Sequence, residues 1–277
     1  MKLRTVAAGT FYPDSPKTLG KMLDSFQSLP VPPLPGPPVG LLLPHAGYSY
    51  SGEVAALGYR ALQKPPETVV VIGPSHSVAF PGTSVFAGEA VATPLGDLAV
   101  DQEAARGLLE SHESMAQFPP AFAQEHSAEV HFPLVRRFLP DSRVLPLVTG
   151  QGGDRVAVPL AEALVRLSKT RRILVVASTD LCHYPEYEVA VKADREFLEA
   201  VLTGDVSAVE RVDQKLMRKG WERFHCTHCG NEPLRALMLF AKLMGADKRE
   251  LLAYRNSGDT TGDHSRVVGY AAVAFCR

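Results

Sequence analysis

The sequence predicts an α/β protein in which a single mixed central sheet carries helices on both faces. Apolar runs of strand length, such as residues 39–43 and 68–72, alternate with segments of helical periodicity. These runs are continuously apolar, which is typical of strands that are covered on both faces. The Pro-rich stretch at residues 29–38 is read as a loop because too little chain precedes it to form a domain. We therefore expect a single domain over residues 1–277.

The first half of the chain contains four expected elements, in order. The aliphatic run at 39–43 is a buried strand, and residues 53–62 have the spacing of a helix. The run at 68–72 is rich in β-branched residues and ends at Gly73-Pro74, so it is a second buried strand. A helix is expected at 101–110, with Asp101 as its cap.

The second half continues the alternation and then changes character. The same criteria predict helices where apolar residues recur at helical spacing and strands where they run together. We also expect some antiparallel pairing near the end of the chain, where the last two strands lie. The expected elements are a strand at 143–148, a helix at 154–167, a strand at 172–177, helices at 187–202 and 232–244, and strands at 250–254 and 267–275.

Composition excludes several classes of function. Lys plus Arg is 29 and Asp plus Glu is 30, and this balance argues against a nucleic-acid or anionic-membrane partner. The mean hydropathy is −0.01, with no apolar run of transmembrane length and no signal-peptide-like start. Four Cys residues in 277 do not make a disulfide scaffold. We expect a cytoplasmic protein with reduced thiols.

Histidines follow three of the expected strands at the point where each strand ends. His45 comes shortly after the first, His76 after the second, and His183 after the strand at 172–177. In open α/β sheets, ligands bind in the crevice outside the carboxyl ends of the strands. If the three strands are parallel neighbours, their histidines converge. One such histidine is commonly structural, whereas three with the same placement favour a functional site.

A cysteine-containing run precedes the helix at 232–244. Cys226 and Cys229 have the spacing of half a zinc site or of a redox pair, and a helix N-terminus favours a thiolate. Because Cys182 and Cys276 stand apart from each other, no second pair completes a zinc knuckle. It is more economical for one cysteine to complete a site with the strand-end histidines.

The run at 124–131 resembles a metalloprotease motif without matching it. His126 and Glu129 are three positions apart and His131 lies five from His126, whereas the zincin motif places its histidines four apart with Glu beside the first. The simplest interpretation is a helix start with a charged, exposed face. We keep His126 and Glu129 as residues that support a site, with His131 less favoured.

Other catalytic patterns do not occur. The chain has no nucleophile-elbow, P-loop or dinucleotide-binding motif. The polar run at 257–264 is interpreted as a turn between two strands, the alternative being that it lines a pocket.

Several blocks together resemble the Memo family, whose prokaryotic members are known as AmmeMemoRadiSam system protein B. They cover most of the chain and occur in the family's order. The blocks are Ala8-Gly9-Thr10-Phe11-Tyr12-Pro13, Pro44-His45-Ala46-Gly47-Tyr48, Gly73-Pro74-Ser75-His76, Glu125-His126-Ser127, Ser178-Thr179-Asp180-Leu181-Cys182-His183 and Cys229-Gly230.

The resemblance implies a fold similar to the class III non-haem iron extradiol dioxygenases and a metal site. Those enzymes hold Fe(II) with two His and a carboxylate. In the Memo family the equivalent ligands are two His and one Cys, which here are His45, His76 and Cys229. His183 matches the dioxygenase acid/base, with Asp180 beside it. A thiolate in place of the carboxylate makes Cu or Zn an alternative to Fe(II).

The resemblance leaves three functions to weigh. The first is a metal-dependent oxidoreductase, or dioxygenase-like enzyme, acting on a small-molecule substrate. The second is a non-catalytic module that binds a metal or a phosphopeptide. The third is an accessory role beside a radical SAM enzyme and an AMMECR-type protein, as the family's prokaryotic name suggests.

Overall fold

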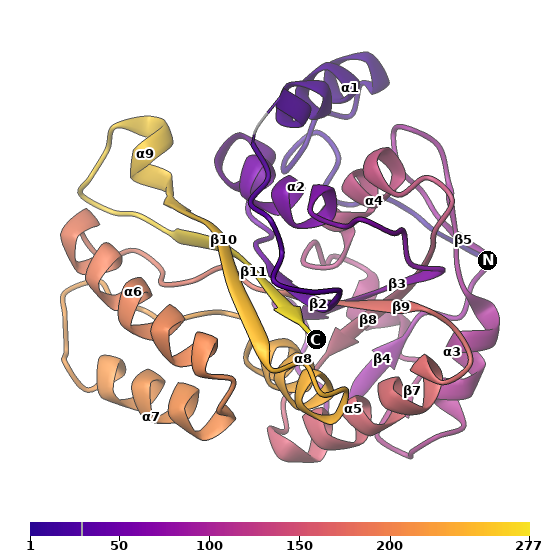
Figure 1. The fold of residues 1–277 in the computed structure, drawn as a ribbon. Coiled ribbons are helices and arrows are strands. Elements are labelled where there is room, and N and C mark those ends of the chain that lie inside the picture. The colour runs from indigo at the N-terminus through magenta and orange to yellow at the C-terminus, as the bar shows by residue number, and fades with distance from the viewer. Residues whose placement is uncertain (29) are drawn as a thin grey trace.

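The computed structural model describes residues 1–28 and 30–277 and is built around an eight-stranded mixed sheet (Figure 1). Strands β2, β9, β3 and β8 form its parallel centre. On one side β11 and then β10 add in antiparallel orientation, and on the other β4 runs antiparallel to β8 and parallel to β7. The strands are β2 (Pro38–Leu43), β3 (Thr68–Pro74), β4 (Thr83–Val85), β7 (Met115–Ala116), β8 (Arg143–Thr149), β9 (Ile173–Ser178), β10 (Lys248–Asn256) and β11 (Gly269–Cys276), beside a small separate sheet of β1 (Lys2–Leu3), β5 (Ala90–Val91) and β6 (Leu98–Ala99).

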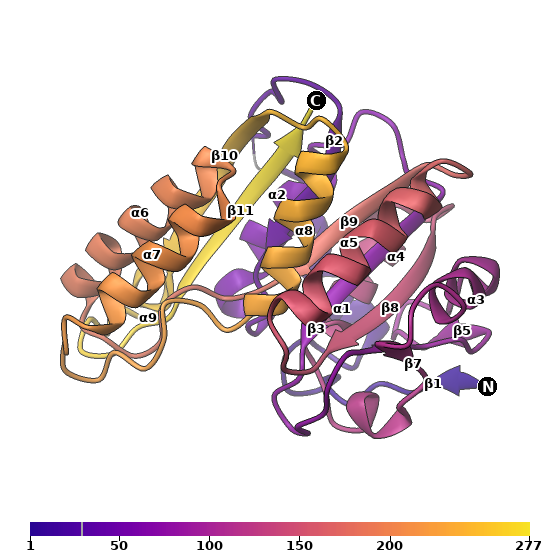
Figure 2. The same cartoon turned by 90° about the horizontal axis from the view of Figure 1, so that it is seen from below.

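Helices cover both faces of the large sheet. Figure 2 shows α5 and α8 lying across one face, while α1, α2 and α4 cover the other in Figure 1. Successive residues of β2 divide between two hydrophobic clusters: Leu42 packs in the same cluster as Leu237 of α8, and Leu41 and Leu43 pack with Tyr59 of α2. The helices are α1 (Pro16–Ser25), α2 (Glu53–Arg60), α3 (Gln102–Leu109), α4 (Phe132–Phe138), α5 (Asp154–Ser168), α6 (Tyr187–Thr203), α7 (Val206–Met217), α8 (Asn231–Leu243) and α9 (Ser257–Thr261).

The predicted fold class is confirmed, and each predicted element is present with its ends shifted by only a few residues. The expected cap at Asp101 forms, since its side chain accepts a hydrogen bond from the Ala104 amide. The antiparallel pairing expected near the end is that of β10 with β11. Helices α1 and α7 were not predicted. Each buries only two residues and is polar on average, so neither stands out in the sequence as an apolar segment.

The Pro-rich segment runs over the surface toward β2. Its first residue, Leu29, lies outside the described residues. Val31 and Leu34 pack against the core. A cavity of about 730 Å³ opens between this segment and the amino ends of β2 and β9, at the opposite end of the strands from the histidines. Among the described helices, none is both long and apolar enough to cross a bilayer.

Candidate metal centre

The carboxyl ends of β2, β9 and β3 lie side by side and place two histidines together. These strands are adjacent and parallel, so the loops that follow them emerge at one edge of the sheet. His45 follows β2 and His76 follows β3, and the centroids of their rings are 5.2 Å apart in an edge-on arrangement. His45 is buried and His76 is partly open to solvent. Burial lowers the pKa of His45 well below its usual value, so this ring is neutral and able to ligate a metal.

A third imidazole, that of His126, completes a compact group. Within the described residues, His45, His76 and His126 form the group of three whose potential ligand atoms all lie within 4.8 Å of one another. The His126 ring stacks on His76, with centroids 4.9 Å apart, and its other neighbour is the ring of Phe11 at 4.2 Å. His126 thus belongs, with the two strand-end histidines, to the group that could hold a metal ion.

Glu125 orients His76. Its carboxylate accepts from His76 Nδ1 at 2.9 Å and from the His76 backbone N–H at 2.5 Å. Burial raises the pKa of Glu125, but the hydrogen bonds from His76 outweigh this and bring it to about 2. A carboxylate can only accept, so the His76 proton is on Nδ1 and the lone pair is on Nε2. A metal-binding histidine has this same arrangement. The sequence analysis placed Glu125 in the block Glu125-His126-Ser127 but did not predict its role in orienting His76.

Cys229 approaches the group from the loop before α8. Its Sγ lies 3.2 Å from Nε2 of His45, and the Asp180 backbone N–H points at the same sulfur from 3.3 Å. Gly230 permits this approach, because a Cβ there would lie 2.6 Å from Thr179 Cβ. Burial and then the charge of Asp180 raise the pKa of Cys229, which outweighs the expected effect of the helix N-terminus. A bound metal would displace the thiol proton.

Asp180 and His183 both follow β9, but Asp180 bonds to the loop that carries His45, whereas His183 bonds to the backbone of its own loop. Asp180 Oδ1 accepts from the backbone N–H groups of His45 and Ala46 at 2.8 and 3.2 Å, which fixes the loop that carries His45. Burial raises the Asp180 pKa to about 7. His183 donates from Nδ1 to the Leu181 carbonyl at 2.8 Å, which leaves a lone pair on Nε2. Burial lowers the His183 pKa, so the ring is a neutral base near pH 7.

Two residues of the 124–131 run lie away from this group. Glu129 and His131 are both buried, so the interpretation of a charged, exposed helix face is wrong. Glu129 accepts from the backbone N–H groups of Val6 and Ala7 and from the Tyr12 hydroxyl, and it supports the wall that carries Phe11 rather than any candidate ligand. The run bends through a short 3-10 turn into α4, so its side chains diverge instead of sharing a face.

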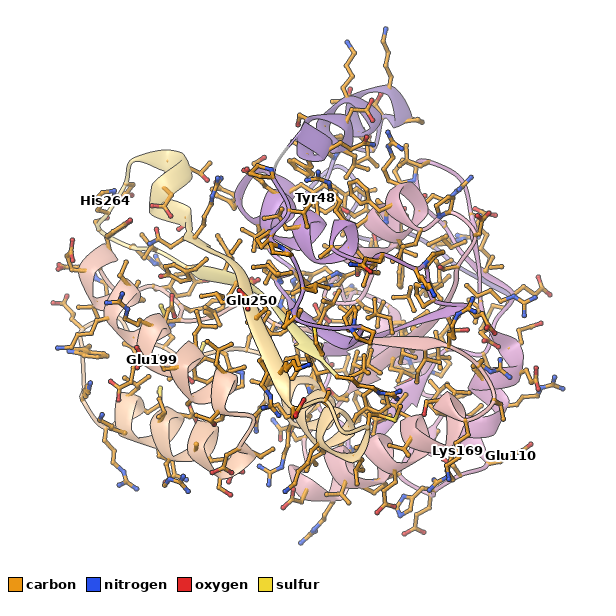
Figure 3. All side chains as sticks on the ribbon, viewed as in Figure 1. Tyr48, Glu110, Lys169, Glu199, Glu250 and His264 are labelled. Carbon is orange, nitrogen blue, oxygen red and sulfur yellow. The ribbon has the colours of Figure 1, made fainter. Side chains whose placement is uncertain are left out.

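The other motifs lie at the rim or outside the centre. Cys226 Sγ is 3.4 Å from Nδ1 of His183. His228 is turned away and packs on Phe197, 4.7 Å between ring centroids. The polar run at 257–264 forms the short helix α9 and an exposed connection between β10 and β11, and Figure 3 shows His264 at the outer edge of the molecule. The run connects the two strands, as expected, but it does so through a short helix rather than a simple turn.

Comparison with known proteins accounts for the order of these motifs. The family model described as "Memo-like protein" matches residues 4–274. The chain belongs to the Memo family. A MEMO1 family protein of Methanopyrus kandleri is 36% identical over 290 residues and covers 100% of both chains. One from Methanobrevibacter smithii is 34% identical over 289 residues, covering 99% of this Memo chain and 100% of the relative.

A solved structure supports the fold of this Memo chain. The crystal structure of an uncharacterized protein from Escherichia coli K12 matches with a TM-score of 0.53. It covers 84% of this chain and 98% of the other, at 16% sequence identity. Identity at that level shows a shared arrangement of strands and helices.

The imidazole and thiol groups gathered at this site of the Memo chain are suitable ligands for a transition metal. The Nε2 atom of His76 is free because Nδ1 is engaged by Glu125, and His45 Nδ1 is likewise engaged by Ser178 at 2.7 Å. Imidazole suits iron, copper and zinc, and a thiolate favours the softer ions among them.

Proposed function

We propose that this protein binds one Fe(II) ion through His45, His76 and Cys229 and acts as a metal-dependent oxidoreductase on a small-molecule substrate. The observation that carries the proposal is the meeting of His45 Nε2 and Cys229 Sγ at 3.2 Å, beside a second imidazole whose Nδ1 is already held by a carboxylate. The compact imidazole group makes His126 the alternative third ligand. Copper and zinc are alternative ions for the same donors.

In the proposed reaction, side chains around the metal accept and hold protons and restrict access of water. A bound metal ion with open positions supplies Lewis acidity and redox chemistry. His183 acts as general base through Nε2, since its Nδ1 proton is committed to the Leu181 carbonyl. Asp180, with a pKa of about 7, holds a proton near the site in neutral solution. Phe11 and His126 form an aromatic wall that restricts water on one side.

Metal binding is tested first, without reference to activity. Protein purified without oxygen is titrated with Fe(II) and, separately, Zn(II), and one ion per chain is expected. His45→Ala and His76→Ala are expected to lose that ion. His112→Ala is the matched control, because His112 is exposed and its contacts among the described residues are with Ser114. Full occupancy in both site variants would show that the ion binds elsewhere.

Catalysis is tested on the loaded protein. Oxygen consumption is followed with a panel of small phenols and diols, comparing the wild type with His183→Ala. The variant is expected to keep its metal and lose turnover, because a general base need only reach the substrate. Absence of oxygen uptake with every compound would defeat the oxidoreductase proposal and leave metal binding standing.

One observation favours the second candidate, a module that binds an anionic ligand without chemistry. The guanidinium of Arg266 lies 4.1 Å above the ring of Tyr184, the residue after His183. Tyr184 has a positive φ of 72°, a strained conformation for a bulky residue that is found at functional positions. Phenyl phosphate is the probe: binding that is lost in Arg266→Ala but kept in His45→Ala would favour this function. The third function, an accessory role beside a radical SAM enzyme or an AMMECR-type protein, would be supported by copurification of this protein with either of them.

A further inference from the structure

A chain of buried hydrogen bonds runs behind the metal centre, from His45 to Tyr59. Nδ1 of His45 lies 2.7 Å from Ser178 Oγ, and this oxygen lies 2.9 Å from Nε2 of His131. On its other side, Nδ1 of His131 lies 3.0 Å from the Tyr59 hydroxyl. All four side chains are at most 2% exposed, so water does not compete for these contacts.

The proton of Ser178 determines the proton of His45. Ser178 Oγ lies 2.6 Å from the backbone carbonyl of Ser127, which can only accept, so the single hydroxyl proton points there. A serine oxygen has two lone pairs left, and two imidazole nitrogens occupy them. Each of those nitrogens must therefore donate. His45 carries its proton on Nδ1, and its Nε2 lone pair is directed to the side where Cys229 lies.

Tyr59 fixes the proton of His131 in the same way. Within the described chain, the partner of the buried Tyr59 hydroxyl is His131 Nδ1, and an unpaired buried hydroxyl would cost free energy. Nδ1 therefore accepts, and the one proton of the neutral ring is on Nε2, facing Ser178. A doubly protonated His131 would be a buried cation without a contacting carboxylate among these residues, which is costly.

We propose that Ser178 and His131 are positioning residues that hold His45 in the tautomer whose Nε2 is free for a metal. This inference rests on the metal centre proposed above and extends it to residues that would not touch the metal. The Ser127 carbonyl and the Glu125 carboxylate belong to one short segment, so the segment that holds the proton of His76 also holds that of Ser178. Gly73 lets this segment approach β3, since a Cβ there would lie 2.2 Å from Ser127 Oγ.

Nuclear magnetic resonance of the metal-free protein tests the tautomer directly. With ¹⁵N-labelled histidine, we expect the wild-type His45 signals to show a protonated Nδ1 and an unprotonated Nε2. In Ser178→Ala, Nδ1 loses its acceptor and the signals are expected to move toward a mixture of tautomers. Ser142→Ala is the matched control: Ser142 is also a buried serine that donates to a backbone carbonyl, that of Pro66, outside this network.

His131 separates positioning from simple packing. In His131→Gln the amide can still donate to Ser178 and accept from Tyr59, so the His45 tautomer is expected to be retained. In His131→Leu the volume is similar but both hydrogen bonds are lost, so the tautomer is expected to become mixed. Equal ring signals in the two variants and the wild type would overturn the role assigned to His131.

Metal affinity provides the second readout. Zn(II) binding is expected to weaken about 10- to 100-fold in Ser178→Ala, the range typical of partners behind a metal ligand, and to be unchanged in Ser142→Ala. If Ser178→Ala does not fold, Tyr59→Phe removes one hydroxyl at nearly constant volume and should shift tautomer and affinity in the same direction, by less. Wild-type tautomer and affinity in the folded variants would overturn the proposal. If the wild type itself binds no metal, the proposed function fails, and the ring signals alone then decide whether the tautomer is held.

Discussion

The Sγ atom of Cys229 lies 3.2 Å from Nε2 of His45, although 184 positions separate the two residues. The contact depends on β2 and β9 being neighbours and on the Cys229 loop docking against the end of β9 through the hydrogen bond from the Gly230 amide to Thr179 Oγ1, 2.8 Å. The two groups therefore meet only in the folded protein, so metal binding and folding are expected to be coupled.

The first prediction decides between Cys229 and His126 as third ligand. Cys229→Ala is expected to weaken metal binding by more than about 100-fold, since loss of a partner behind a ligand alone costs 10- to 100-fold. His126→Ala should cost less, because His45 and Cys229 remain. Co(II) is the spectroscopic probe: absorption from a thiolate–cobalt bond should vanish in Cys229→Ala and persist in His126→Ala. Persistence of that absorption in Cys229→Ala would assign the sulfur elsewhere.

The second prediction concerns Cys182, which the sequence suggested is structural. Its side chain packs in a small apolar cluster with Ala190 and Val267, on the side of α6. Burial and then the nearby Asp194 raise its pKa, so the thiol is protonated and inert. Cys182→Ala is expected to keep its full metal content while losing about 1 kcal/mol of stability. Metal analysis beside a urea titration checks both; loss of metal in a folded variant would make Cys182 a ligand.

Strand-end placement predicted that His45 and His76 lie together, because the topology of a parallel sheet determines which edge its loops share. The same reasoning included His183, which is not part of their compact group. It could not place His126. That ring is brought to the site by a loop whose path depends on Gly73 leaving room for Ser127, a contact between residues 54 positions apart. The position of Cys229 was inferred from family resemblance rather than from any pattern, since a Cys-x-x-Cys pair before a helix is compatible with several chemistries.

The third prediction concerns the wall formed by the N-terminal segment. Glu129 is 5% exposed and accepts three hydrogen bonds from that segment, including one of 2.5 Å from the Tyr12 hydroxyl. Glu129→Gln replaces one acceptor by a donor, which leaves buried N–H or O–H groups unpaired and should cost about 1–3 kcal/mol. Limited proteolysis should then cut near residues 6–12. Tyr12→Phe removes one of the three bonds and should cost less. Wild-type stability in Glu129→Gln would show that the segment is held by other contacts.

The last prediction concerns the pH dependence of stability and arises from a buried carboxyl group that holds the loop following β9. Asp194 of α6 is fully buried and accepts from the Cys182 backbone N–H at 3.1 Å and from the Tyr254 hydroxyl at 2.8 Å. Burial raises its pKa from 3.8 to about 6, and these hydrogen bonds offset only part of that rise. A Cβ on Gly269 would lie 1.9 Å from Asp194 Oδ2, so the carboxyl group is confined by β11.

The sign of the effect follows from which state binds the proton more tightly. The folded protein holds the Asp194 proton up to about pH 6, whereas the unfolded chain releases it near pH 3.8. The contribution of this group to stability is therefore greatest below pH 3.8 and is lost as the pH rises to 6. The total loss is about 3 kcal/mol, from 1.36 kcal/mol per pKa unit. Asp194→Asn cannot ionise, so its stability should lack this decline between pH 4 and 6. Urea unfolding of both proteins across that range is the measurement, and parallel curves would mean that Asp194 ionises at its ordinary pKa.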